Sequence, residues 1–305
     1  MKQRILVTGG SGVVGRALRQ ALEASGNETV NLDLAAQGVE NGDIRHAERV
    51  HSALSDCAGV IHLAAISRVG CAEHNPNECL STNVEGTRTV LHVASSASHR
   101  PWVLFVSSRE VYGNPSNLPV VEGAPLSPVN VYGRSKVEGE RLVERAARDG
   151  LRTGIVRLTN VMGSPSDQPD RVIPSFIRAA TTGKQLRVNG PNRRFDFVHV
   201  TDVVRGLVAY VALFSGSKAS LPTVHLASGR GVSLGHLAEV VVRATRSTSS
   251  VRFADTAPTD VQTFVGDPTQ ASQLLGWKST ITVEQCVESL VPRSQHRINP
   301  EVNES

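Results

Sequence analysis

The sequence predicts an α/β fold: a doubly wound parallel sheet with a smaller, mostly C-terminal lobe. Two observations lead to this prediction. Short aliphatic runs, each about as long as a buried strand, alternate with amphipathic helical patterns over residues 1–160. From Thr159 onward the elements become shorter and are interrupted by Pro and Gly, which is typical of an irregular lobe over the edge of a sheet.

Composition and charge exclude several classes of protein. The chain has 305 residues, of which 40% are hydrophobic, so it can form one large domain or a domain with a smaller partner. Its net charge of +4 is not concentrated in a Lys/Arg run, which argues against nucleic acid as a partner. No apolar run approaches the roughly 20 residues of a membrane span. The four cysteines form no CxxC pair and the first strand begins almost at once, so we expect reduced thiols, no metal site, no signal peptide and a cytoplasmic location.

The first element is a strand that leads directly into a glycine-rich turn and a helix. Glycines recur three residues apart, at Gly9, Gly12 and Gly15. Gly9 permits a sharp turn, Gly12 lets the backbone approach a ligand, and Gly15 lets the helix pack closely against the sheet. The helix N-terminus offers unpaired N–H groups and a positive dipole end, which suits a pyrophosphate. This stretch predicts a Rossmann-type dinucleotide site. The residues expected to contact the cofactor here are Gly9, Gly12, Val13, Val14 and Gly15.

The second and third strands end in residues that also suit a dinucleotide. The second, residues 29–33, ends in Asp33, whose carboxylate can accept both ribose hydroxyls of an adenosine and would repel a 2′-phosphate. We therefore predict NAD rather than NADP, although an acid that merely starts a turn is the alternative. The third strand contains His62, which we expect to be a core histidine. It closes with small residues that permit close approach of a cofactor, namely Leu63, Ala64 and Ala65.

Two strand–helix pairs continue the alternation. Residues 75–97 are predicted to form a long helix, and residues 102–108 a strand that ends in two serines. A helix over 131–148 and a strand over 152–158 follow. Because the carboxyl ends of parallel strands meet at one edge of the sheet, the glycine-rich turn, Asp33 and the two serines are expected to lie together.

These patterns predict how the chain divides. Residues 1–160 are expected to form the dinucleotide-binding domain, completed by parts of about 196–228. Residues 161–195 and 229–292 are expected to form a substrate-binding lobe, and residues 293–305 a flexible tail.

A possible catalytic set lies on the helix over residues 131–148. Tyr132 and Lys136 are four residues apart, so they share one helix face. A free phenol has a pKa of about 10, and a nearby ammonium would lower it towards neutrality. Ser108, at the end of the neighbouring strand, would hold the substrate oxygen. Beside a nicotinamide, this set can oxidise a secondary alcohol. The alternative is an ordinary helix face that carries a Tyr–Lys pair.

Taken together, these motifs resemble the extended short-chain dehydrogenase/reductases, in the nucleotide-sugar epimerase/dehydratase branch. The resemblance spans Arg4 to about Leu290. The segments that carry it are Thr8–Gly15, Asp43–Ile44, His62–Ala65, Asn83–Thr87, Ser107–Gly113, Tyr132–Lys136, Arg157–Val161, Phe197–Asp202 and Leu275–Lys278.

The resemblance implies a cofactor, a substrate class and an assembly. Asp33 would hold the adenosine ribose of NAD, and Asp43 and Ile44 would meet the adenine. Lys136 would touch the nicotinamide ribose and Asn160 the substrate phosphates. Asn83 is also assigned to the cofactor site. The substrate would be a nucleotide-sugar, linked to UDP, dTDP, GDP or CDP. The two long helices would pair with those of a second copy in a homodimer.

Two residues after the serine bear on the type of reaction. Relatives oxidise C4 of the sugar, after which an epimerase returns the hydride to the opposite face. Dehydratases and decarboxylases use additional residues just after the serine, here Arg109 and Glu110. The thymidine-sugar 4,6-dehydratases have Asp-Glu there, so Arg109 removes an expected acid. Glu110 is either a base for C5 or a solvated loop carboxylate. We predict a 4-epimerase, with a dehydratase or decarboxylase that uses Glu110 as the alternative.

One departure concerns the substrate diphosphate. Many relatives have Arg at the position of Phe195, and we expect Arg194 to supply the missing charge. Two other classes of protein are less consistent with the sequence. A non-enzymatic dinucleotide-binding sensor would typically lack the Tyr–Lys pair, and Asp33 opposes an NADPH-dependent reductase.

Overall fold

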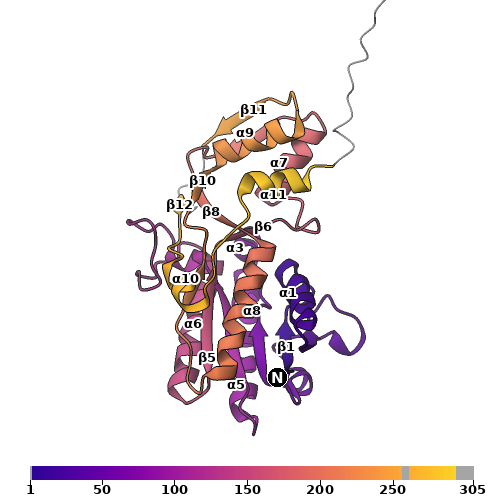
Figure 1. Cartoon of the computed structure of the whole chain (residues 1–305), viewed down its shortest axis with the longest axis vertical. Helices are drawn as coiled ribbons and strands as arrows, with labels where there is room; N and C mark the ends of the chain where they lie inside the picture. Colours follow the sequence, from indigo (N-terminus) through magenta and orange to yellow (C-terminus); the bar gives the residue numbers. More distant parts are fainter. Residues whose placement is uncertain (1, 256–260, 293–305) are drawn as a thin grey trace, which may run out of the picture.

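Six parallel strands form the main sheet, in the order β2-β1-β3-β4-β5-β9. Figure 1 shows this sheet and its helices below a smaller lobe. The computed structural model describes residues 2–255 and 261–292. The strands are β1 (Arg4–Thr8), β2 (Glu28–Leu32), β3 (Gly59–His62), β4 (Trp102–Ser108), β5 (Thr153–Leu158) and β9 (Val224–Leu226). From β1 the chain passes to β2 on one side and then to β3 on the other. This reversal is the topological switch point, beside which ligands bind in such sheets.

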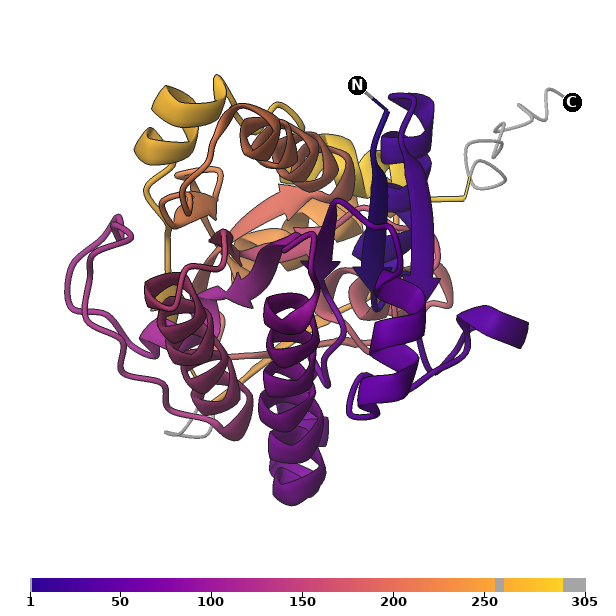
Figure 2. The same cartoon turned by 90° about the horizontal axis from the view of Figure 1, so that it is seen from below.

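Helices cover both faces of this sheet (Figure 2). One face carries α1 (Val13–Ala24) and α8 (Val200–Gly216), and the other carries α2 (Ala47–Leu54), α5 (Gly86–Ser96) and α6 (Val131–Arg148). Successive side chains of β1 point to opposite faces. Ile5 and Val7 therefore join the core under α1 and α8, whereas Leu6 joins the core under α2 and α5. The predicted doubly wound sheet is confirmed.

A smaller lobe lies beyond the carboxyl ends of the strands. Its central sheet is built on β8 (Arg194–His199), which pairs with β6 (Asn160–Met162), β10 (Gly231–Ser233) and β12 (Thr263–Phe264). A second pair joins β7 (Leu186–Asn189) to β11 (Val251–Ala254). The helices of the lobe are α7 (Val172–Thr181), α9 (Leu234–Thr245) and α11 (Val283–Leu290), which share one apolar core with these strands.

Two segments lie close to the predicted boundary between the main domain and the lobe. The strand β8 pairs within the sheet of the lobe and overlaps the start of the range, about 196–228, parts of which are predicted to complete the main domain. Conversely, α10 (Thr269–Leu275) and Trp277 pack in the core of the main sheet through Ala271 and the indole ring. Trp277 Nε1 also donates to the carbonyl of Asp202 in α8, 2.8 Å away. The predicted tail, 293–305, lies outside the described residues.

The predicted helix over 75–97 is interrupted. After the short helix α3 (Val69–His74), the chain forms α4 (Pro76–Leu80), a wider π-helical turn over Ser81–Glu85, and then α5. Pro76 occupies the first turn of α4, where its missing N–H costs no hydrogen bond. All four cysteines are free thiols. Among the described residues, no helix is both long and apolar enough to cross a membrane.

Candidate active site

A cavity of about 810 Å³ lies between the carboxyl ends of the main strands and the lobe. It receives residues from the glycine-rich turn, from the ends of β2, β3 and β4, from α6 and from the lobe. Within the described ranges, no group of three His, Cys, Asp or Glu side chains could hold a metal ion.

The glycine-rich turn forms one end of the cavity. A Cβ on Gly15 would lie 2.4 Å from the carbonyl oxygen of Gly9, so the close packing of α1 on the turn requires glycine there. At Gly12 the same oxygen is 3.3 Å from such a Cβ, and no other described atom lies within 4 Å. No side chain caps the N-terminus of α1. An uncapped helix end with space in front of it fits a pyrophosphate.

Asp33 is held by backbone groups at the same end. Its Oδ2 accepts a hydrogen bond from the N–H of Ser11 at 2.9 Å, and its Oδ1 accepts one from Ala35 at 2.7 Å. The carboxylate therefore has a set orientation beside the cavity, which it lines together with Val13, Val14, Leu63, Ala64 and Ala65.

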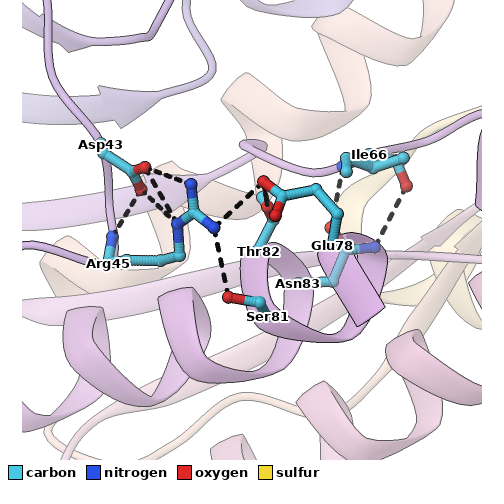
Figure 3. Close-up of polar contacts among 7 residues, drawn as sticks. All are labelled: Asp43, Arg45, Ile66, Glu78, Ser81, Thr82 and Asn83. Atoms are coloured by element: carbon cyan, nitrogen blue, oxygen red, sulfur yellow. Dashed lines mark hydrogen bonds and ion pairs between the residues drawn. The ribbon is translucent and has the colours of Figure 1, made fainter. Parts of the chain in front are cut away.

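Asp43 and Ile44 line the cavity next to Asp33. The guanidinium of Arg45 pairs with both carboxylate oxygens of Asp43, the nearest contact being 2.6 Å, and holds the pKa of that carboxyl below its usual range. Arg45 also reaches Glu78 at 3.0 Å and Ser81 at 3.2 Å, as Figure 3 shows. Asp43 is therefore tied through Arg45 to α4 and the π-helical turn.

Asn83 has a different place from the one predicted. It was assigned to the cofactor site, but it is absent from the described lining of the cavity. Its side chain is buried, accepts from the N–H of Ile66 at 2.8 Å and donates to the Ile66 carbonyl at 3.1 Å (Figure 3). It also donates to Ser135 Oγ at 2.9 Å. Asn83 therefore joins the segment after β3 to the helix α6 and supports the wall of the cavity without lining it.

His62 is a buried residue of the sheet and is not among the lining residues. Its Nδ1 lies 2.6 Å from Thr8 Oγ1, and its Nε2 lies 3.0 Å from Thr87 Oγ1. Burial, with a smaller contribution from the charge of Lys136, lowers the pKa of His62 to about 3. The prediction of a core histidine is confirmed.

Ser108, Tyr132 and Lys136 all line the cavity. Ser108 ends β4, and its hydroxyl forms a hydrogen bond with the phenol of Tyr132. Lys136 stands one turn further along α6. Its ammonium donates to the carbonyl of Val106 at 2.9 Å and lies 4.7 Å from the ring centroid of Phe105. The structure therefore brings the three predicted catalytic residues to one wall of the cavity.

The charge state of Tyr132 differs from the expectation. Burial raises the pKa of Tyr132 to about 12, while the hydrogen bond with Ser108 acts in the opposite direction. Burial also lowers the pKa of Lys136 to about 8. In the protein alone, desolvation of the phenolate thus outweighs any help from the ammonium. A phenolate at neutral pH requires additional positive charge in the cavity.

Glu110 is buried and is not the solvated loop carboxylate that was one of its two predicted alternatives. Its Oε1 pairs with Arg109 Nη2 at 2.8 Å, and its Oε2 accepts from Asn130 Nδ2 at 2.7 Å. Asn130 is also the N-cap of α6, since its side chain accepts from the N–H of Gly133. Sequence reasoning did not assign Asn130 to the site, although an Asn directly before a predicted helix is the usual signal for an N-cap.

Arg194, which was predicted to hold the substrate diphosphate, does not line the cavity. Its side chain is exposed, and its Nε donates to the carbonyl of Gly231 at 3.0 Å. Alternation along β8 explains this, because neighbouring residues point to opposite faces. Phe195 lines the cavity instead, together with Arg193 from the turn before the strand. The other predicted substrate residue, Asn160, does line the cavity and donates to the carbonyl of Asp196 at 3.3 Å.

A surface segment over residues 163–171 covers the cavity between its two ends. An ion pair joins Asp170 of this segment to Arg68, which follows β3. A hydrogen bond of 2.9 Å joins Ser166 to Arg16 of α1. The segment therefore connects the lobe to the dinucleotide-binding half directly above the cavity.

A doubly wound sheet, an uncapped helix end and an oriented acid at the switch point define a dinucleotide-binding α/β protein. Over residues 5–219 the chain matches the NAD dependent epimerase/dehydratase family, and it belongs to that family. NAD is accordingly its cofactor, as predicted. The residues present fit this cofactor, because Gly12 leaves space at the helix end and Asp33 faces the cavity.

Similar proteins include several nucleotide-sugar enzymes. A UDP-glucose 4-epimerase from Streptomyces lividans is 30% identical, over 91% of this chain and 92% of its own length. A UDP-glucuronic acid decarboxylase 1 from Xenopus tropicalis is 28% identical, over 99% of this chain and 74% of its own. The solved structure of a UDP-glucose 4-epimerase from Thermotoga maritima with UDP-glucose has a TM-score of 0.84 and 25% identity, covering 94% and 97% of the two chains. The chain is therefore an enzyme of the nucleotide-sugar epimerase, dehydratase and decarboxylase group.

Proposed function

We propose that the protein is an NAD-dependent nucleotide-sugar 4-epimerase. The observation that carries this proposal is the pairing of the Glu110 carboxylate with two neighbouring side chains. Both of its carboxylate oxygens are engaged, one by Arg109 and the other by Asn130. These two buried contacts fix the carboxylate in the cavity wall, so turning it towards C5 would weaken them. Ser108, Tyr132 and Lys136, which would serve C4, line the same cavity as Glu110, so it is the fixed position of Glu110 that favours epimerisation over elimination or decarboxylation.

The proposed chemistry of the side chains is a proton transfer at the C4 hydroxyl. NAD, when bound, supplies the hydride-accepting ring and positive charge close to the phenol. Tyr132 Oη takes the hydroxyl proton and later returns it, while Ser108 Oγ holds the same substrate oxygen. Lys136 contributes positive charge from the side of β4, where its ammonium donates a hydrogen bond to the Val106 carbonyl. Because the phenol is buried, its pKa responds strongly to the charge that enters the cavity.

Product analysis on a panel of nucleotide-sugars tests this proposal. The protein is incubated with UDP-, dTDP-, GDP- and CDP-linked sugars, and the products are analysed by mass spectrometry and NMR. We expect a product of unchanged mass with inverted C4. Loss of water would identify a dehydratase and loss of carbon dioxide a decarboxylase, which are the competing functions in which Glu110 would act as a base. No conversion of any of these sugars would contradict the proposed 4-epimerase.

We further propose a homodimer through α5 and α6. The two helices pack side by side on one face of the sheet, which would allow two copies to form a four-helix bundle. Light scattering on the purified protein tests this proposal, for which we expect twice the mass of the chain. The mass of one chain would contradict it.

A further inference from the structure

Asn130 is a buried residue to which the proposed reaction gives no role. It lies two positions before Tyr132, directly before the helix α6, and is absent from the described lining of the cavity. Its side-chain amide both accepts and donates. Oδ1 accepts from the N–H of Gly133 at 2.7 Å, and Nδ2 donates to Glu110 Oε2 at 2.7 Å. One amide therefore joins the first turn of α6 to the segment that follows β4.

The backbone at this junction is packed as closely as the side chains. A Cβ on Gly133 would lie 2.5 Å from the carbonyl oxygen of Glu110, so glycine is required for the first turn of α6 to approach this segment. The N–H of Val131 is paired as well, since it donates to Glu73 Oε1 of α3 at 2.7 Å. The start of α6 is therefore held in place from two sides.

Glu110 is also connected to Ser108. Its backbone N–H donates to Ser108 Oγ at 3.2 Å. A hydroxyl has one proton and two lone pairs, so this bond leaves the proton and one lone pair for the phenol and the substrate oxygen. The hydroxyl forms a hydrogen bond with the phenol of Tyr132. Glu110 therefore acts on both members of this pair, because its N–H orients Ser108 and its carboxylate holds, through Asn130, the turn that carries Tyr132.

We propose that Asn130 is a positioning residue that sets the distance between Tyr132 Oη and Ser108 Oγ, with the Glu110 carboxylate as its anchor. This inference rests on the proposed function for the role of the phenol at C4. Proton transfer requires hydrogen-bond distance, and a displacement of about 1 Å can lower a rate by about 10²-fold. Tyr132 lies in the turn that Asn130 holds, so loss of the bond to Glu110 moves the phenol and leaves the cofactor end of the cavity as it is.

Steady-state kinetics of the NAD-loaded protein test the proposal, with the UDP-, dTDP-, GDP- or CDP-linked sugar that the wild type converts fastest. Asn130→Ser keeps an oxygen that can cap α6 but removes the donor to Glu110. We expect kcat to fall at least about tenfold, while KM and the NAD content change less than about threefold. The lower limb of the pH profile of kcat should also move to higher pH, because the Tyr132 phenolate loses the hydrogen bond that lowers its pKa.

An exchange of the two side chains gives the sharpest test. In Asn130→Asp two carboxylates face each other, and in Glu110→Gln the amide offers an oxygen to only one of Arg109 and Asn130, so each single variant should lower kcat. In the double variant Glu110→Gln/Asn130→Asp, the new amide can donate to the new carboxylate, which can also accept from Gly133 as an N-cap. We expect the double variant to recover kcat to within about threefold of the wild type.

Ser233→Ala is the matched control. Ser233 is the N-cap of α9, where its Oγ accepts from the N–H of His236 at 3.1 Å, and it is absent from the described lining of the cavity. The variant loses a helix cap far from the proposed chemistry. We expect a lower unfolding temperature and a kcat within about twofold of the wild type, so that a loss of stability alone would not account for a lower kcat.

Several results would overturn the proposal. One is an Asn130→Ser variant with the kcat of the wild type. Loss of bound NAD or of the folded state in Asn130→Ser would mean that the bond supports the fold as a whole and not the phenol. A double variant no more active than Glu110→Gln would also contradict it, since that result is expected if Glu110 carries a proton.

The products of the reaction keep this inference separate from the proposed function. Recovery of kcat in the double variant of an enzyme that releases water or carbon dioxide would contradict the 4-epimerase alone. Inversion at C4 without recovery would contradict this inference alone. No conversion by the wild type would overturn both.

Discussion

The cofactor end of the cavity is lined by the glycine-rich turn, residues 9–15, and by residues that follow the strands β2 and β3. At the substrate end, the contacts come from side chains on β4, β6, β8 and α6, which are far apart in the sequence. The first end offers N–H groups and space. The second offers buried charges that are already paired with each other, as in Arg109 and Glu110.

This difference explains how the two ends can serve different purposes. Backbone groups at a helix end bind any pyrophosphate of suitable shape, so the cofactor end can be common to many related enzymes. Paired side chains hold each other in fixed positions, as Arg109 and Glu110 do. They can therefore discriminate between substrates that differ by a single group. The predictions below separate the two ends, in order of decreasing expected effect.

Tyr132→Phe should separate cofactor binding from turnover most strongly. The ring remains to fill its buried place, but the proton carrier is gone. We expect turnover to fall by about 10²–10⁴-fold, while the NAD content of the purified protein stays as in the wild type. Steady-state kinetics and the absorbance of released cofactor measure the two quantities. Unchanged turnover would remove Tyr132 from the mechanism.

Lys136 belongs to the catalytic set proposed above. Because burial lowers its pKa, the free energy of unfolding should depend on pH. The folded side chain releases its proton near pH 8, whereas the unfolded one keeps it to about 10.5. Unfolding therefore takes up a proton between these values, and the free energy of unfolding should rise with pH in this window, by up to about 3 kcal/mol. Urea unfolding at pH 7.5, 8.5 and 9.5 measures it. The difference between wild type and Lys136→Met isolates the residue, and a difference that does not vary with pH would contradict the assignment.

Gly12→Ala should damage only the cofactor end. The new methyl group meets Gly9 O at 3.3 Å and otherwise points into the cavity, where it would push a pyrophosphate away from the N–H groups of α1. We expect at least about tenfold weaker NAD binding with little change in the unfolding temperature. Gly123→Ala is the control, since a Cβ there meets no described atom within 4 Å. If Gly12→Ala bound NAD normally, the cofactor could not lie against this turn.

Arg194→Gln should have the smallest effect. The side chain is exposed and bonds to the Gly231 carbonyl away from the cavity. Because this side chain is not among the lining residues, we expect kcat/KM for a nucleotide-sugar to change by less than about twofold. A loss of tenfold or more, measured at low substrate concentration, would restore Arg194 as a substrate ligand.

The site residues that the structure brings to the cavity are predicted from local patterns. The turn at Gly9–Gly15, the acid at the end of β2 and the Tyr–Lys spacing on α6 each describe neighbours in the sequence, and all of them line the cavity. The two predicted residues outside its lining depend on where a side chain points. Asn83, in the π-helical turn, is bonded to Ile66, and Arg194 is turned away by strand alternation. The position of each side chain follows from the register of its element, which the sequence analysis did not fix.

The sequence alone determined the fold class, the family and the cofactor of this protein, because strand and helix periodicity and the glycine turn are properties of short stretches. Only the tertiary structure decided how the charges are paired. It buried Glu110 between Arg109 and Asn130, raised the pKa of Tyr132 to about 12, and left one nitrogen of Arg109 without a partner among the described residues. Desolvation and charge pairing depend on groups that the fold brings together from distant parts of the chain, so they cannot be predicted from residues adjacent in the sequence.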